Sequence, residues 1–180
     1  MRENEQRDWR LPAFGEFCPS PLDWARLAAY IDGEGSILIN TQKRGEDKAV
    51  GFYLRVTVAN TDVRLPIWLK ETFGGTYKDA NTPSYYVGKN WRRCYHWGAS
   101  AHRAAWVLYN CMPYFIIKPD QAVLGIQLQE SLSHFTRGPG RRVPSEIREQ
   151  RRELKRRLLQ MKARGVVLED DQKKRIEEVS

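Results

Sequence analysis

Glu34, an acidic residue between two glycines, is the side chain of this sequence best placed to do chemistry. The segment before it has the apolar spacing of a helix, with Ser20 as N-cap and Pro21 in the first turn. Gly33 and Gly35 predict that this helix stops at Glu34, where the backbone can turn sharply and approach a ligand closely. A carboxylate in that position suits a metal ion bound beside a phosphate. A buried amphipathic helix capped by a Gly-Glu-Gly turn is the structural alternative.

The segment after Glu34 predicts a β-hairpin, because apolar and polar residues alternate over 36–42 and 50–59 on either side of a polar turn. One face would point apolar side chains toward a core: Ile37, Ile39, Leu54, Val56 and Val58. The opposite face would carry Leu38, Asn40, Gln42, Tyr53, Arg55 and Thr57. Asn, Gln and Arg can make paired hydrogen bonds to base edges, so this face could read the major groove of DNA. An ordinary half-solvated sheet would show the same alternation.

The rest of the chain predicts further helices and strands. Helix starts are indicated at 60–62, at Ser100, at Pro119 and at Pro144, where a strongly basic helix begins. Strands are expected over 76–79, 84–89 and 93–97, which completes an antiparallel sheet of about four strands. Helices combined with an antiparallel sheet predict an α+β fold. The basic helix could pack against the domain or contact phosphates beside a main DNA site, and its sequence favours neither.

Cations and an aromatic residue near the turns of this sheet would lie beside the proposed DNA groove. They are Arg44, Lys78, Tyr85, Lys89, Arg92 and Arg93. Contacts from turn cations to backbone phosphates fix the register of a protein on DNA without reading its sequence.

Length, charge and cysteine content limit the class of protein. A chain of 180 residues with 41% hydrophobic content can bury one core. We expect that domain at 20–135, between an N-terminal arm at 1–19 and a basic, mainly helical extension at 136–180. The net charge is +8, of which +6 lies in the extension with its 14 basic and 8 acidic residues, and this favours a polyanionic partner. The three cysteines, Cys18, Cys94 and Cys111, are expected to be free thiols.

The start of the chain is polar rather than signal-like, and no apolar run reaches membrane-spanning length. We therefore expect no membrane partner and an intracellular protein, in a bacterial or archaeal cytoplasm or in an organelle.

The decapeptide LAAYIDGEGS at 27–36 resembles the signature of the LAGLIDADG homing endonucleases, with Glu34 at the position of the metal-binding acid. Ala29 departs from the family pattern, which usually has glycine there, but alanine is still small enough for close helix packing. With the order and spacing of the later elements, the resemblance covers about two thirds of the chain, residues 21–135.

Two later segments resemble the family as well. VANTDVR at 58–64 brings Asn60 and Arg64 to polar positions that order solvent around the scissile phosphate. MPYFIIKPDQA at 112–122 brings Lys118 to the position of a lysine that points into the active site. A lysine there could stabilise the charge that develops on the phosphate.

The resemblance implies an αββαββα core with a curved antiparallel DNA-binding sheet, and a metal-dependent DNA endonuclease. The catalytic residues would be Glu34, Asn60, Arg64 and Lys118. Glu34 and the carbonyl of Gly33 would bind Mg²⁺, and no organic cofactor is implied.

A single motif of this type occurs in the chain, which implies a homodimer. Its helices would pack through Leu27, Ala28, Ala29 and Ile31, and a two-fold dimer would cut both strands of a long palindromic or pseudo-palindromic DNA target. An intron-encoded homing endonuclease is the function this favours. A cleavage-deficient RNA maturase or DNA-binding regulator is the alternative; a pure binder, however, has no need for an acid beneath a phosphate.

Overall fold

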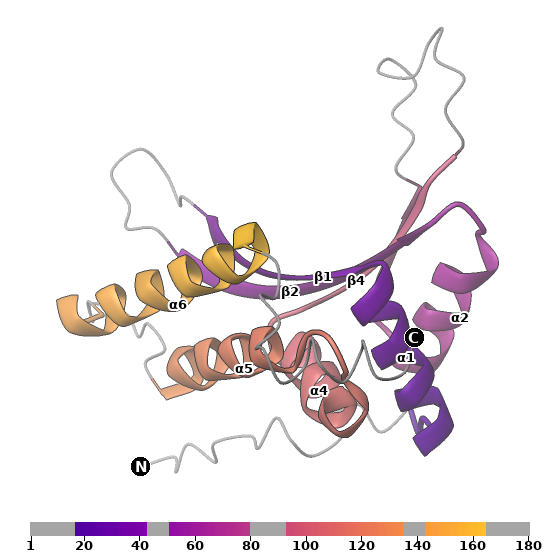
Figure 1. The fold of residues 1–180 in the computed structure, drawn as a ribbon, viewed down its shortest axis with the longest axis horizontal. Helices are drawn as coiled ribbons and strands as arrows, with labels where there is room; N and C mark the ends of the chain where they lie inside the picture. Colours follow the sequence, from indigo (N-terminus) through magenta and orange to yellow (C-terminus); the bar gives the residue numbers. More distant parts are fainter. Residues whose placement is uncertain (1–16, 43–50, 80–92, 135–142, 165–180) are drawn as a thin grey trace, which may run out of the picture.

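The computed structural model describes residues 17–42, 51–79, 93–134 and 143–164 of the 180-residue chain. Helices and strands follow one another in an α+β arrangement (Figure 1), as the sequence predicts. The elements are α1 (Pro21–Gly33), β1 (Gly35–Gln42), β2 (Gly51–Asn60), α2 (Arg64–Phe73), β3 (Thr76–Asp79), β4 (Tyr95–Ser100), α4 (His102–Cys111), the 3₁₀ turn η1 (Met112–Tyr114), α5 (Pro119–His134) and α6 (Ser145–Arg164). Among the described helices, none combines the length and the apolar composition needed to span a lipid bilayer.

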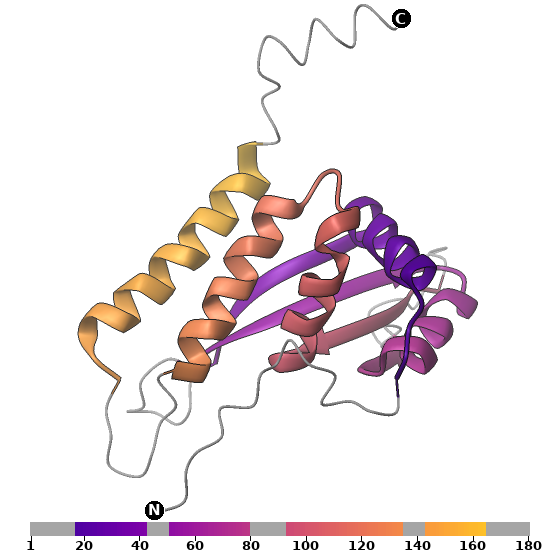
Figure 2. The same cartoon turned by 90° about the horizontal axis from the view of Figure 1, so that it is seen from below.

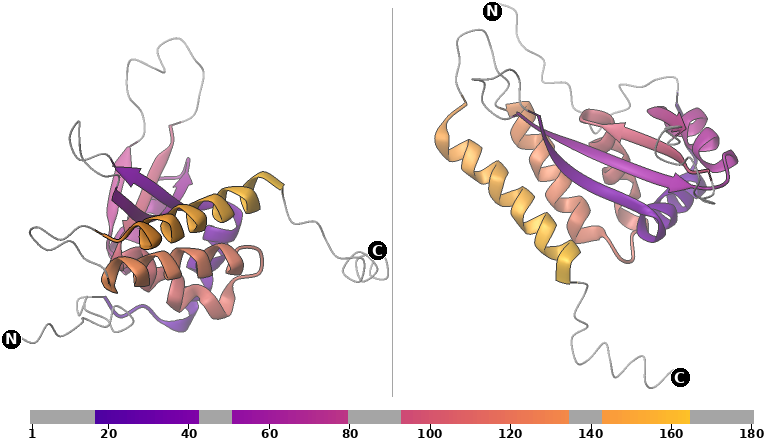
Figure 3. Two further views of the ribbon diagram at one scale, coloured as in Figure 1. Left: turned by 90° about the vertical axis from the view of Figure 1, so that its left-hand side faces the viewer. Right: turned by 90° about the horizontal axis from the view of Figure 1, so that it is seen from above.

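The four described strands form one antiparallel sheet in the order β1-β2-β4-β3. The predicted hairpin is confirmed: Ile37 pairs with Val56 and Ile39 with Leu54, and all four side chains are buried. Helices α1, α2, α4 and α5 lie on one face of the sheet (Figures 1 and 2), α6 lies beside its β1 edge, and the view from above shows the other face without a described helix over it (Figure 3, right). The sheet therefore has one face in the core and one face open to a ligand.

The core lies between the sheet and the helices. Trp24 of α1 packs edge-on against Trp106 of α4, with ring centroids 4.8 Å apart, and lies 5.0 Å from the Phe73 ring of α2. Leu158 of α6 is 2% exposed and joins the same hydrophobic cluster. Burying a large apolar side chain contributes about 1.5–3 kcal/mol, so α6 is held to the domain by more than its polar contacts.

Helix α1 begins as predicted, in a capping box: the backbone N–H of Asp23 donates to Ser20 Oγ, and the backbone N–H of Ser20 donates to Asp23 Oδ2. The predicted dimer interface needs a correction. Leu27, Ala28 and Ile31 have no exposed surface because they face the core of their own subunit, whereas Ala29 is exposed. Of these predicted interface residues, only Ala29 can offer its side chain to a partner.

Two other helix starts differ from the expected ones. Helix α2 begins at Arg64 after Val63, with no side-chain cap hydrogen bond to its first turn. Helix α4 follows Ala101, which has a positive φ of 53°, because Ser100 is still paired with Arg55 in the sheet and cannot cap a helix. The strand expected at 84–89 lies outside the described residues.

Candidate active site and nucleic-acid interface

Glu34 is the residue directly after α1, and it is exposed. Its backbone N–H donates to the Tyr30 carbonyl at 2.9 Å, which completes the last helical turn, and β1 starts at the next residue. A Cβ atom on Gly35 would lie 2.6 Å from Ile31 Cα, so only glycine allows the strand to leave this close to the helix. The tight turn fixes the point from which Glu34 projects.

Asn60, the last residue of β2, holds the Glu34 carboxylate. Its Nδ2 donates to Glu34 Oε2 at 2.7 Å, and its Oδ1 accepts from the backbone N–H of Asp62 at 2.7 Å. Because both ends of the Asn60 amide are engaged, the amide group has one orientation. Two residues predicted for the site, 26 positions apart in the sequence, are thus in direct contact.

Arg64 reaches the same region through Asp62. Arg64 Nε donates to both carboxylate oxygens of Asp62 at 3.0 Å, and the Arg64 backbone N–H also donates to Oδ1. These hydrogen bonds lower the pKa of Asp62 to about 2. The Arg64 side chain remains 87% exposed, so it faces solvent while in contact with Asp62, whose backbone N–H donates to Asn60.

Lys118 lies behind the Glu34 turn. Its Nζ donates to the backbone carbonyls of Ile31 at 2.6 Å, Asp32 at 2.7 Å and Gly35 at 3.0 Å. An ammonium group has three donors, and the last carbonyls of a helix lack intrahelical partners. Lys118 therefore caps the C-terminus of α1 with two of its donors and binds the first residue of β1 with the third. Burial lowers the pKa of Lys118, and the charge of Asp32 opposes this shift.

Asp32 is the site residue that the sequence reasoning missed. Its carboxylate accepts backbone N–H groups from Ile116 at 2.8 Å, Ile117 at 3.1 Å and Lys118 at 3.0 Å. It is 9% exposed, one position after Ile31 on the buried side of α1. An acid on the apolar side of a helix is unusual unless it is paired, and this signal was available in the sequence.

The open face of the sheet carries the side chains expected to meet DNA. Leu38 pairs with Arg55, Asn40 with Tyr53 and Ser36 with Thr57, so these residues share one face. Lys78 pairs with His96 in β4, which in turn pairs with Ala59, and this places Lys78 on the same face. The face is polar and is continuous from β1 to β3, as a ribbon that enters a groove must be.

Two of the residues predicted to contact DNA lie at or next to the end of a strand, and four others lie outside the described residues. Arg93 forms an ion pair with Asp79 at 3.7 Å, just before β4. Gln42 is exposed at the end of β1. Arg44, Tyr85, Lys89 and Arg92 lie outside the described residues.

Solved structures with a similar fold are homing endonucleases. I-CvuI, solved in complex with its DNA target in the presence of calcium, matches with a TM-score of 0.63 and 18% identity over 83% of this chain and 85% of that chain. The archaeal intron-encoded homing endonuclease I-Vdi141I, solved with DNA, gives a TM-score of 0.62 and 15% identity over 83% and 89%. The LAGLIDADG homing endonuclease I-GzeII, also solved with its DNA target, gives 0.51 and 15% over 77% of this chain but only 44% of that longer chain.

The chain has the LAGLIDADG homing-endonuclease fold. No protein-family model and no curated protein sequence matches the chain. The likeness is therefore structural, and the LAGLIDADG motif at the end of α1 occupies the helix-to-strand turn described above.

The donors at this turn fit a hard divalent cation. Glu34 offers an exposed carboxylate, and the exposed Gly33 offers a carbonyl that is not among the three bound by Lys118. Oxygen donors of this kind, completed by water and phosphate, are what Mg²⁺ prefers. Within the described part of the LAGLIDADG fold, no group of three or more His, Cys, Asp or Glu side chains gathers at one point.

Proposed function

We propose that the protein is a homing endonuclease that cuts both strands of a specific DNA site. The observation that carries this proposal is the exposed Glu34 carboxylate, which Asn60 holds at 2.7 Å at the end of a sheet whose open face is polar. An exposed acid at the end of a surface proposed to bind DNA serves little purpose in a simple binder, because it repels phosphate until a cation intervenes. The similar structures are homing endonucleases solved with DNA.

Each site residue has a distinct part in this chemistry. Glu34 and the Gly33 carbonyl would hold Mg²⁺, which when bound would supply an activated water and a positive charge beside the phosphate oxygens. Asn60 keeps one carboxylate oxygen oriented, and the exposed Arg64 offers a cation to the phosphate or its solvent. Lys118 is a positioning residue, because its ammonium group fixes the carbonyls beneath the Glu34 turn.

The enzyme works as a homodimer in this proposal, joined along the exposed side of α1. Ala29 and Gly33 are small and exposed four residues apart, which allows a second helix to approach closely. Leu22 is 59% exposed and Tyr30 38% exposed on the same helix, and burying them would stabilise the pair. This chain matches 44% of the I-GzeII chain, which is consistent with one subunit of a two-part enzyme.

Two-fold symmetry then makes the target palindromic or pseudo-palindromic, with the sheet of each subunit on one half-site. Asn40, Gln42 and Arg55 are the side chains best suited to base edges, because amide and guanidinium groups pair with adenine and guanine.

The test is a selection of DNA sites from a library of duplexes with randomised, two-fold-symmetric cores. Duplexes bound by the full chain in Ca²⁺ are recovered, sequenced, and then incubated with Mg²⁺. The proposal expects one family of related sites and a double-strand break within each site. Tight, specific binding without cleavage in Mg²⁺ would instead support the DNA-binding regulator.

A further inference from the structure

Helix α6 is fixed against the domain at a defined register. Arg151 is 5% exposed; its Nε donates to Ser131 Oγ at 3.0 Å and its Nη2 to the Ser131 carbonyl at 2.6 Å. Leu158 is buried two turns further along the same side. A basic helix anchored by a buried arginine and a buried leucine is held in one position on α5 (Figure 2), unlike a solvated tail.

This register brings the end of α6 to the catalytic end of the molecule. Helices α5 and α6 run in opposite directions, and Arg151 of α6 contacts Ser131 of α5. Lys162 follows Arg151 by eleven residues, and Asp120 precedes Ser131 by eleven residues, so Lys162 and Asp120 lie at the same level along the two helices. Asp120 is two residues from Lys118. An independent sign of this proximity is that burial, and then the charge of Lys118, lower the pKa of Lys162.

One flank of α6 carries four basic side chains, with the exposed apolar Leu159 between the last two of them. Arg148, Arg152, Lys155 and Lys162 are spaced by four, three and seven residues, which places them on one side of a helix. We call this row the α6 stripe. Lys155 Nζ lies 3.4 Å from Thr41 Oγ1 near the outer end of β1, so the stripe borders the edge strand of the sheet.

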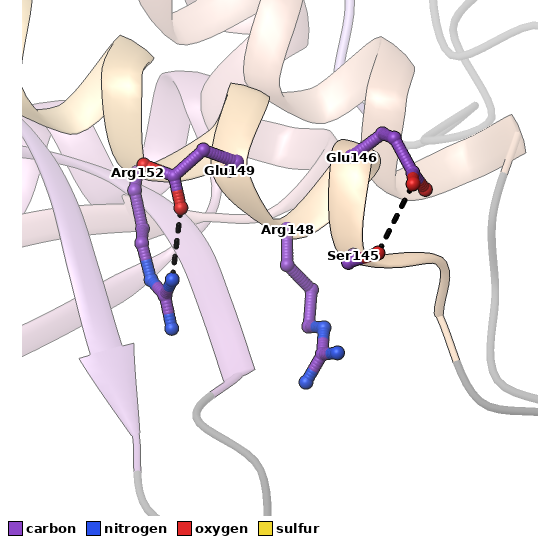
Figure 4. A pocket seen from close by; sticks show the side chains of 5 residues that line it. All are labelled: Ser145, Glu146, Arg148, Glu149 and Arg152. Atoms are coloured by element: carbon purple, nitrogen blue, oxygen red, sulfur yellow. Dashed lines mark hydrogen bonds and ion pairs between the residues drawn. The ribbon is translucent and has the colours of Figure 1, made fainter.

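The outer part of the stripe is open to solvent. Arg148 and Arg152 point to the same side of α6, beside a hollow that Ser145, Glu146 and Glu149 also line (Figure 4). Arg152 Nη1 donates to Glu149 at 2.9 Å, and both side chains are more than 60% exposed, so water screens this pair. Helix α6 as a whole has eight basic and three acidic residues.

We propose that the α6 stripe binds backbone phosphates of the DNA target along the β1 edge, from the outer end of each half-site to the catalytic end. The proposal rests on the proposed function and extends it to a second protein element. The stripe runs over fifteen residues, and its two ends are about 21 Å apart along the helix, which equals the axial length of about six base pairs. A row of cations of that length complements one strand of duplex DNA and carries no base readout.

The test compares two single substitutions on the same helix. Arg148→Gln removes a stripe charge, and Arg157→Gln removes another exposed charge nine residues away, on the opposite side of α6. The probe is the end-labelled duplex recovered by the selection above, titrated in Ca²⁺ over a range of salt concentrations. Arg148→Gln should weaken binding about fivefold at 0.15 M salt and lower the slope of log affinity against log salt by about one. Arg157→Gln should match the wild type.

A shortened duplex adds a positional test. Without its outermost base pairs, the difference between Arg148→Gln and wild type should disappear, while the loss caused by Lys162→Gln at the inner end should persist. Equal salt slopes for Arg148→Gln and Arg157→Gln would overturn the proposal. Wild-type protein that binds no duplex at all would overturn the proposed function as well. Binding without cleavage would count against the proposed catalysis alone. The salt slopes of Arg148→Gln and Arg157→Gln would still decide whether the α6 stripe binds phosphates.

Discussion

Asp32 and Lys118 bind each other's backbone. The Asp32 carboxylate accepts the N–H groups of 116–118, and the Lys118 ammonium group donates to carbonyls at the end of α1 and the start of β1. This reciprocal contact joins the two segments that resemble the homing endonucleases most clearly. It lies directly behind Glu34, so the position of the proposed catalytic acid depends on it.

Replacing Asp32 with alanine should therefore destabilise the domain. Three N–H groups would lose a charged acceptor in a part-buried site, and we expect a loss of about 2–3 kcal/mol in the free energy of unfolding. Urea unfolding followed by circular dichroism measures it. Lys118→Met serves as the second arm of a double-mutant cycle, in which the double variant should lose less than the sum of the two single losses. Additive losses would show that the two residues act independently.

Asp62 should titrate near pH 2. Its folded pKa lies below the model-compound value of 3.8 because Arg64 donates to it, so the carboxylate stabilises the folded state fully above about pH 4. That contribution is lost as the pH falls from 3.8 toward 2. NMR titration of the Asp62 carboxyl carbon checks this. In Arg64→Gln the pKa should return toward 3.8; an unchanged low value would mean that Arg64 is not the cause.

The sequence predicts the scaffold of the site well because local patterns decide it. The Ser20 capping box, the alternation in β1 and β2 and the glycine after Glu34 each act within a few residues, and each is confirmed. The pairing of Asn60 with Glu34 could be expected only through the family resemblance, since no local pattern links residues 26 positions apart.

The departures come from tertiary contacts. The ammonium group of Lys118 was expected to face the active site, but carbonyls at the end of α1 and the start of β1 engage all three of its donors. Leu27, Ala28 and Ile31 were expected in a dimer interface, but the same small and apolar side chains are what the subunit core requires. Helical spacing identifies an apolar side of a helix without showing which partner covers it.

Asn40 and Lys78 lie on the open face of the sheet, and their substitution should affect DNA binding in different ways. Asn40→Ala should cost about 1–3 kcal/mol of binding at one base pair and relax the preference there, whereas Lys78→Gln should weaken binding to all sequences about equally. Competition titrations with duplexes altered at single positions distinguish the two. Uniform weakening by Asn40→Ala would indicate that the residue contacts phosphate and reads no base.

Ala29→Leu should separate the proposed dimer. The added side chain would project from the exposed side of α1, where the second helix must approach closely, so the dissociation constant should rise at least tenfold. Sedimentation velocity over a concentration series measures it. Ala163→Leu adds the same group to an exposed position of α6 and should leave the association unchanged. An unchanged association in Ala29→Leu, or the same change in both variants, would show that α1 is not the interface.

The central claim is that Glu34 holds the catalytic metal, and its most direct test pairs cleavage with binding in Glu34→Gln. The substitution keeps the shape and the Asn60 contact but removes the charge that attracts Mg²⁺. Plasmid cleavage in Mg²⁺ should fall below detection, while affinity for the same site measured without divalent cation should stay equal or rise, since a carboxylate facing phosphate is repulsive when no cation lies between them. Cleavage by Glu34→Gln at the wild-type rate, on a site that both proteins bind, would contradict the account.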